Sequence, residues 1–298
     1  MTGRLIDDAF LDRLQTFAMA TKTSMRGYFG GTHRTAGYGS TVEFAEYREY
    51  VPGDDIRRVD WNLYGRFERF FIKLFADERQ MHNRILIDTS ASMAKADPAK
   101  AEYALRLAAA MGYLSVLGMD KVSFGMLDGN ACQDLAGTVV GKEAFFGALE
   151  RMEEVPFGGE CDLGRAIKSS STGHSDGVTV IVSDFLTDSD WRGAVDYLLF
   201  HKRQVLLVQV LSPRELSPEG AGRTYLCDSE SIGLPDPKNM KHRINKGALE
   251  AYERALKEYL EDVRRFCASR GCDYTVASTD TPIERLLFGS LYELGVVK

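Results

Sequence analysis

The sequence has few of the features that mark secreted, zinc-binding or membrane-spanning proteins. Its five cysteines are an odd number in a chain of 298 residues, and their spacing matches neither a zinc site nor a disulfide framework. No apolar run approaches the length of a transmembrane helix, and the first residues contain no apolar core of a signal peptide. We therefore expect a soluble protein without a membrane span, located in the reducing cytoplasm.

Common catalytic signatures are also missing. The histidines include no His-x-x-x-His pair, no Gly-x-Ser-x-Gly elbow occurs, and no glycine-rich loop leads to a Walker lysine. The formal net charge of −6 gives no general attraction for nucleic acid. Arginines between residues 57 and 84 leave RNA binding as a third hypothesis, but acidic side chains are interleaved with them. These absences favour a binding protein that does not bind nucleic acid.

From residue 81 onward, short apolar runs alternate with longer helical patterns. The runs are rich in β-branched and aliphatic residues, which is typical of strands buried on both faces. The expected strands are 84–87, 121–127, 178–183, 204–211 and 272–277, and the expected helices are 98–118, 141–152, 162–171, 190–202 and 247–270. This alternation predicts an α/β fold with a doubly wound, mainly parallel sheet.

The rest of the chain suggests a division into two parts. Residues 5–22 have the apolar spacing of an amphipathic helix, and residues 23–80, rich in glycine, aromatics and arginine, predict a small β-rich subdomain. We therefore expect an N-terminal part at 1–80 and an α/β domain at 81–298. Prolines at 212–246 predict a long excursion with one or two short strands around Thr224-Tyr225-Leu226.

Polar residues follow two of the expected strands. Asp88, Ser90 and Ser92 come after the strand at 84–87, and Asp184 follows the strand that ends at Ser183. In an open α/β sheet, ligands bind at the carboxyl ends of the strands, near a topological switch point. Carboxylate and hydroxyl oxygens suit Mg²⁺ or Mn²⁺. The sequence therefore predicts a metal site at these four residues, with helix capping as the alternative role for the Asp-x-Ser-x-Ser run.

The same residues carry a family resemblance. Asp88-x-Ser90-x-Ser92, the Gly-Gly loop at 158–164 and Ser183-Asp184 together resemble the metal-ion-dependent adhesion site of von Willebrand A domains. Further upstream, Pro52-Gly53-Asp54-Asp55 and Asp60-Trp61 resemble the signature of domain of unknown function 58. That bacterial family places this box directly before a von Willebrand A-like domain, and the resemblance covers about residues 20–295.

The resemblance implies a function without catalysis. Members of the family resemble binding or scaffold proteins, often associated with MoxR-type AAA+ ATPases and thought to help mature or remodel other proteins. In von Willebrand A domains a carboxylate from the partner completes the metal shell. We therefore expect a non-enzymatic protein-binding module whose partner, an AAA+ ATPase or its client, offers an acidic side chain.

One residue departs from the family pattern. Cys161 stands where the Gly-Gly loop has a threonine, and a thiol is a poor ligand for Mg²⁺ because the hard cation prefers oxygen. Either Asp162 or a water substitutes for the threonine, or the affinity for metal falls, or the site is degenerate. A small buried thiol is the structural interpretation of Cys161.

A second function from another class is a Mg²⁺-dependent phosphohydrolase with Asp88 as nucleophile. Such enzymes place a second aspartate two residues later as acid and base, where this chain has Ser90. No catalytic lysine is evident from the pattern.

The Pro-Gly-Asp-Asp box also has a local structural interpretation. Pro52-Gly53 predicts a turn, and Asp54 or Asp55 can cap a short helical turn. We expect Asp60 to pair with Arg57 or Arg58 beside Trp61.

Overall fold

The computed structural model describes residues 5–21, 33–35, 44–52, 54–75, 77–95, 97–170, 177–218, 226–227, 239–240 and 246–290. The chain divides into two compact units. The smaller unit is Thr32–Gln80, and the larger unit combines Met1–Gly31 with Met81–Lys298.

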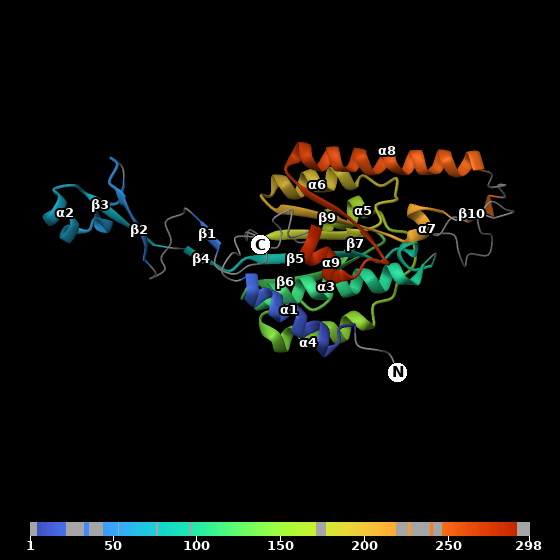
Figure 1. The fold of residues 1–298 in the computed structure, drawn as a ribbon, viewed down its shortest axis with the longest axis horizontal. Helices are drawn as coiled ribbons and strands as arrows, with labels where there is room; N and C mark the ends of the chain where they lie inside the picture. The colour runs from blue at the N-terminus through green and yellow to red at the C-terminus, as the bar shows by residue number, and fades with distance from the viewer. Residues whose placement is uncertain are drawn as a thin grey trace. The chain divides into compact units, whose positions relative to one another are not determined.

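A six-stranded sheet forms the centre of the larger unit (Figure 1). Its strands are β5 (His82–Asp88), β6 (Lys121–Asp128), β7 (Ala131–Asp134), β8 (Val178–Ser183), β9 (Gln204–Leu211) and β12 (Asp273–Ser278). They lie in the order β12-β9-β8-β5-β6-β7, and every neighbouring pair is parallel except β6 with β7. The predicted doubly wound, mainly parallel sheet is confirmed.

Helices cover both faces of this sheet (Figure 1). One face packs against α1 (Asp8–Thr21), α3 (Pro98–Leu117), α4 (Gly141–Glu153) and α9 (Ile283–Arg285), and the other against α5 (Leu163–Ser169), α6 (Trp191–Phe200) and α8 (Lys246–Arg270). Ile85 and Ile87 enter the first core and Leu86 the second, because successive strand side chains point to opposite faces. None of the helices in the described ranges is long and apolar enough to cross a membrane.

Helix α1 is part of the larger unit, although the sequence had grouped it with residues 23–80. Phe10 and Leu14 are buried in the same core as α3, and Arg13 pairs with Glu284 at 2.8 Å. The apolar stripe of α1 therefore packs on the α/β unit. Chain order alone had suggested the boundary at residue 80, whereas packing assigns the helix to the sheet that follows it.

The excursion after β9 contains little regular structure among its described residues. It begins with α7 (Pro213–Leu216), and β10 (Leu226–Cys227) pairs antiparallel with β11 (Asn239–Met240). The expected short strand thus includes Leu226, while Thr224 and Tyr225 lie outside the described residues.

The smaller unit contains two antiparallel strand pairs and two short helices. Its elements are β1 (His33–Thr35), β2 (Phe44–Glu49), the 3-10 turn Ile56–Arg58, α2 (Trp61–Phe67), β3 (Phe71–Phe75) and β4 (Asp77–Arg79). Asp55 caps the 3-10 turn, as expected. Asp60 caps α2, but its ion pair is with Lys73 at 2.9 Å instead of the arginines expected. Lys73 lies on the adjacent β3, which local sequence spacing does not indicate.

His82 gives the larger unit a pH-dependent stability. Its Nε2 lies 3.1 Å from the Ser123 Oγ, and burial, aided by the charges of Arg84 and Arg203, lowers its pKa to about 4. Since an unfolded histidine titrates near 6.5, the unfolded chain binds more protons between these two values, and stability falls as pH falls through that window.

We expect the free energy of unfolding, measured in urea, to fall by roughly 1–3 kcal/mol more in the wild type than in His82→Gln between about pH 7 and pH 4.5. The comparison removes the contribution of carboxylates, which both proteins share. Parallel pH profiles for the two proteins would contradict this assignment.

Candidate functional site

The predicted site lies at the switch point of the sheet. β5 has β6 on one side and β8 on the other, so the chain leaves β5 in one direction and later returns on the opposite side. Asp88 is the last residue of β5, and Asp184 directly follows β8. The structure thus brings the two predicted carboxylates to neighbouring strand ends, where open α/β sheets bind ligands.

Asp88 is a buried carboxyl group held by neutral donors. It is 4% exposed; its Oδ2 accepts a hydrogen bond from the Ser183 hydroxyl at 2.6 Å, and its Oδ1 accepts one from the Ser90 N–H at 2.9 Å. Burial raises its pKa, and the nearby charge of Asp184 acts in the same direction. Within the described residues Asp88 has no ion pair. The charge of this carboxylate is therefore not balanced by a cation of its own.

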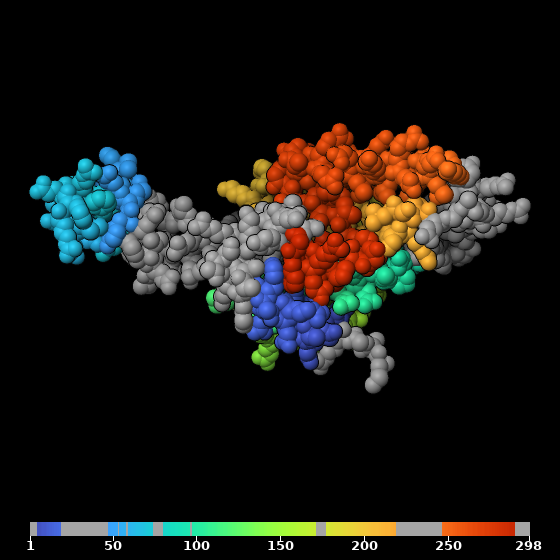
Figure 2. All heavy atoms as spheres, in the orientation of Figure 1, coloured from blue at the N-terminus to red at the C-terminus, as the bar shows by residue number. Residues whose placement is uncertain are grey.

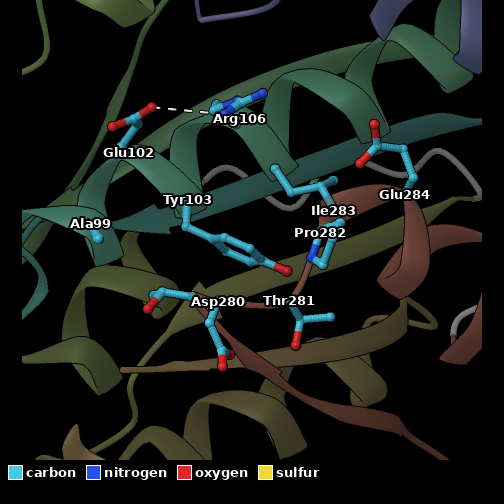
Figure 3. Close-up of a pocket in the computed structure, with 10 residues that line it drawn as sticks. Ala99, Glu102, Tyr103, Arg106, Asp280, Thr281, Pro282, Ile283 and Glu284 are labelled. Carbon is cyan, nitrogen blue, oxygen red and sulfur yellow. Dashed lines mark ion pairs between the residues drawn. The ribbon is translucent and has the colours of Figure 1, made fainter. Parts of the chain in front are cut away.

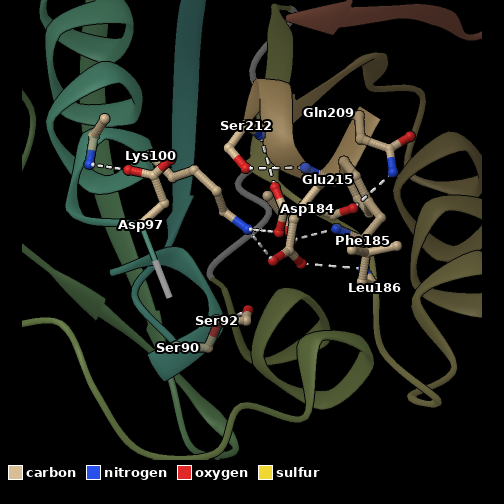
Figure 4. Close-up of polar contacts among 12 residues, drawn as sticks. Ser90, Ser92, Asp97, Lys100, Asp184, Phe185, Leu186, Gln209, Ser212 and Glu215 are labelled. Atoms are coloured by element: carbon tan, nitrogen blue, oxygen red, sulfur yellow. Dashed lines mark hydrogen bonds and ion pairs between the residues drawn. The ribbon is translucent and has the colours of Figure 1, made fainter. Parts of the chain in front are cut away.

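The two serines turn hydroxyl oxygens toward each other on the same loop. The Ser90 and Ser92 Oγ atoms are 3.0 Å apart. Figure 4 shows the two side chains next to each other. Ser90 precedes a 3-10 turn, Ala91–Met93, but its side chain makes no capping hydrogen bond, and α3 is capped by Asp97. Helix capping therefore does not account for the serines.

Asp184 has a cationic partner that the sequence did not suggest. The fully buried Lys100 places its Nζ 2.8 Å from the Asp184 Oδ2 and 2.7 Å from the Glu215 Oε1 (Figure 4). Burial lowers the pKa of Lys100, but the two carboxylates outweigh burial and the net pKa is raised. The Lys100 ammonium therefore stays charged and compensates the negative charge of Asp184.

A pattern in α3 could have revealed this lysine. Lys100 recurs with Ala104, Leu107 and Met111 at helical spacing, and all four are buried. A lysine on an otherwise apolar stripe needs a buried carboxylate partner, because an isolated buried charge is very unfavourable. Glu215 carries no such signal, since it lies in α7 after a turn.

The Gly-Gly loop lies against the Asp-x-Ser-x-Ser loop. The Gly158 N–H donates to the Thr89 carbonyl at 2.8 Å, and the Ala91 N–H donates to the Gly159 carbonyl at 3.0 Å. Gly159 has a φ of +79°, a conformation that favours glycine. These two bonds hold the loops together beside the site.

Cys161 and Asp162, which follow this loop, have structural partners. Cys161 is 8% exposed and packs in the core under α5 and α6. Asp162 caps α5 by accepting the Arg165 N–H at 3.0 Å, and the Arg165 Nε lies 3.3 Å from its other oxygen. The Asp162 carboxylate is thus engaged by its own helix.

An open cavity of about 710 Å³ borders the site at Ser92, the one of the four predicted residues that lines it. Its wall combines Ser92 and residues 160–162 with the loop after β8 and Tyr259 of α8. Among the described lining residues are the acids Glu160, Asp162 and Asp188, and no lysine or arginine. The cavity beside Ser92 is therefore lined by acidic side chains.

The donor set fits a hard divalent cation. In the part of the chain that the structure describes, no three His, Cys, Asp or Glu side chains gather as a metal site, so a metal here depends on serine hydroxyls. Asp88, Ser90 and Ser92 supply hard oxygens from one loop. Within the described residues, Lys100 is the only cation paired with Asp88, Asp184 or Glu215, which leaves a deficit of positive charge that a bound cation would fill.

The fold and the site together define an α/β domain with a doubly wound, mainly parallel sheet, whose predicted site lies at the switch point. The family model described as "Protein of unknown function DUF58" matches residues 46–256, and the chain belongs to this family. The matched range includes both the Pro-Gly-Asp-Asp box and most of the α/β domain.

Relatives are found in mycobacteria. The chain is 26% identical over 287 residues to the uncharacterized proteins Rv1480 and MT1527 of Mycobacterium tuberculosis and Mb1516 of Mycobacterium bovis, covering 94% of this chain and 88% of each relative. Among solved structures, the conserved hypothetical protein BatB from Bacteroides thetaiotaomicron is similar at 15% identity with a TM-score of 0.44, covering 72% of this chain and 98% of that one. The SpRpn10 VWA domain is similar at 11% identity with a TM-score of 0.37, covering 70% and 94%.

Proposed function

We propose that this chain is a non-enzymatic, cytoplasmic protein-binding module that binds an acidic side chain of a partner through a divalent cation. Asp88, Ser90 and Ser92 would hold the cation, and Asp184 would add charge while it remains paired with Lys100. The observation that carries the proposal is the uncompensated, buried Asp88 carboxylate beneath two adjacent hydroxyls.

The charge of the cavity explains why a cation is needed. Glu160, Asp162 and Asp188 would repel an acidic partner that approached the cavity directly. Bound Mg²⁺ or Mn²⁺ would offer an open coordination position to the partner's carboxylate. The chain's own part is to fix the oxygens on a rigid loop, which the hydrogen bonds from Ser183 and the Ser90 N–H accomplish.

The partner proposed from the family resemblance is a MoxR-type AAA+ ATPase or its client. A cavity of about 710 Å³ has room for an acidic side chain of that partner. Loss of binding on addition of a chelator would support this arrangement.

The alternative of a Mg²⁺-dependent phosphohydrolase gains one observation, since Lys100 is a buried cation beside Asp184. The geometry at Asp88 argues against it. Both Asp88 oxygens already accept hydrogen bonds, and no second carboxyl follows at Ser90 to act as acid and base. Turnover of a generic aryl phosphate in Mg²⁺ that is lost in Asp88→Asn would support the enzyme instead.

Metal titration tests the proposed site. We expect saturable calorimetric binding of Mg²⁺ and Mn²⁺ to the wild type, with loss of binding in Asp88→Ala and Asp88→Asn. Free metal at about 100 times the dissociation constant should raise the free energy of unfolding of the wild type by about 2.7 kcal/mol and leave both variants unchanged. The exposed Asp12, on α1, gives a matched control as Asp12→Ala.

Two results would contradict the proposal: no heat and no metal-dependent stabilisation in the wild type, or equal metal binding by the Asp88 variants. Far-ultraviolet circular dichroism of each variant separates loss of the site from loss of the fold.

A further inference from the structure

A second cavity, of about 340 Å³, is lined by residues of α3 that do not include Lys100. Ala99, Glu102, Tyr103 and Arg106 share one helix face at helical spacing, and residues 279–284 form the opposite wall as the chain passes from β12 into α9. Figure 2 shows α1, α3 and the C-terminal segment side by side on this face, and Figure 3 shows the cavity itself. The metal-site residues take no part in it.

The cavity contains a buried phenol without a hydrogen-bond partner. Tyr103 is 6% exposed, and its hydroxyl has no partner among the described residues. Figure 3 shows this hydroxyl pointing toward the turn at Asp280–Pro282. Burying a hydroxyl without a partner costs about 1–3 kcal/mol, so the site is incomplete without a group that bonds to it.

Charges around the hydroxyl select a cationic ligand. Glu102, Asp280 and Glu284 line the cavity, and Arg106 is the cation among its lining residues, with its Nη1 3.8 Å from the Glu102 carboxylate. Glu284 is paired with Arg13 of α1, which leaves Asp280 as the lining carboxylate with no ion pair among the described residues. Burial raises the pKa of Tyr103, and the charges of Asp280 and Glu284 raise it further. The phenol therefore remains protonated, and its oxygen offers lone pairs to an incoming N–H donor.

The apolar part of the wall indicates what kind of cation fits. Ala99, Pro282 and Ile283 also line the cavity and can contact an alkyl chain. Apolar side chains provide no ligands for a metal ion. In the described residues, no three acidic, histidine or cysteine side chains gather as a metal site. A primary ammonium on an alkyl chain matches both the polar and the apolar lining of the cavity. Its N–H groups can donate to the hydroxyl and to a carboxylate, while its alkyl chain packs on the apolar side chains.

We propose that this cavity is a binding site for an alkylammonium group, in which the ammonium donates to the Tyr103 Oη and to the Asp280 carboxylate. A lysine side chain of a partner protein and a free alkylamine share this chemistry. The site requires no divalent cation, so it works independently of the metal site, and its ligand has the opposite charge from the acidic group expected there.

The test titrates the full chain, followed by NMR and calorimetry, with n-butylamine, with the blocked peptide acetyl-Gly-Lys-Gly-amide, and with neutral n-butanol. We expect both amines to bind in the presence of EDTA and n-butanol not to bind. Tyr103→Phe should weaken amine binding by about 10–100-fold, since it removes a hydrogen bond to a charged donor. Tyr113→Phe, the same change further along α3, is the matched control and should bind as the wild type does.

The Tyr103→Phe variant should fold, because the substitution removes only a hydroxyl that has no partner among the described residues. Tighter binding of the peptide than of n-butylamine would identify a partner's lysine as the ligand, and the reverse would identify a free amine. Absence of amine binding, equal binding of n-butanol, or equal affinity of Tyr103→Phe and the wild type would overturn the proposal. None of these results depends on metal, so they do not bear on the metal site.

Discussion

Lys100→Met is expected to lower the free energy of unfolding by about 3–5 kcal/mol, because it leaves the buried carboxylate of Asp184 and the partly exposed carboxylate of Glu215 without their cation. Methionine keeps the length and helix propensity of the side chain, so the change isolates the ammonium. Urea denaturation at neutral pH, fitted to a two-state transition, measures the difference. The same change at the exposed Lys257 of α8 is the matched control and should cost less than about 0.5 kcal/mol.

A double-mutant cycle separates the ion pair from simple packing. Combining Lys100→Met with Asp184→Asn should recover part of the loss, because the amide carries no charge to be left uncompensated. Additive losses in the cycle would show that Lys100 acts through packing alone. A loss below about 1 kcal/mol in the single variant would show that the ion pair contributes little to folding.

Phe185→Ala is expected to cost about 3–5 kcal/mol of stability, since the ring is fully buried and its removal leaves a cavity. The ring packs 5.2 Å from Trp191, measured between centroids, and it follows Asp184 in the chain. Phe185 has a φ of +53°, a conformation that is unfavourable for a non-glycine residue and that persists only where its surroundings hold it. The burial of the ring therefore holds the turn that orients Asp184.

Phe200→Ala provides the comparison, because Phe200 is 83% exposed at the end of α6. It should change the free energy of unfolding by less than about 0.5 kcal/mol. If Phe185→Ala proved as mild as Phe200→Ala, the ring would not be what holds the turn. Metal titration of Phe185→Ala would also show whether the turn affects the site.

The fold was largely predictable because β5, β6, β8 and β9 are largely buried on both faces, and because α8 has a distinct apolar stripe. The helices expected at 98–118 and 247–270 are observed as α3 and α8 to within a residue at each end. Strand β7 was not expected, since its short, mostly exposed segment has no apolar run. Its pairing with β6 depends on the turn at Gly129, which has a φ of +56° and no hydrophobic signal.

The site was predicted in part. The structure brings Asp88, Ser90 and Ser92 together on one loop and places Asp184 at the adjacent strand end, as the spacing after each strand suggests. The sequence did not reveal that Asp184 has an ion-pair partner. Lys100 lies 84 residues before Asp184 in the chain, and Glu215 lies 31 residues after it. Whether the four residues bind metal stays a prediction.

Helix α8 has a consequence for the energetics of binding. The Tyr252 hydroxyl donates to the Glu215 carbonyl at 2.8 Å, and the Tyr259 hydroxyl donates to the Phe185 carbonyl. Two tyrosines of one helix thus hold the segments that carry both carboxylate partners of Lys100, in the absence of a ligand. Preorganised loops lose little conformational entropy when they capture a ligand, so a small number of contacts can give useful affinity. The outermost helix therefore contributes to recognition without any requirement that it touch the partner.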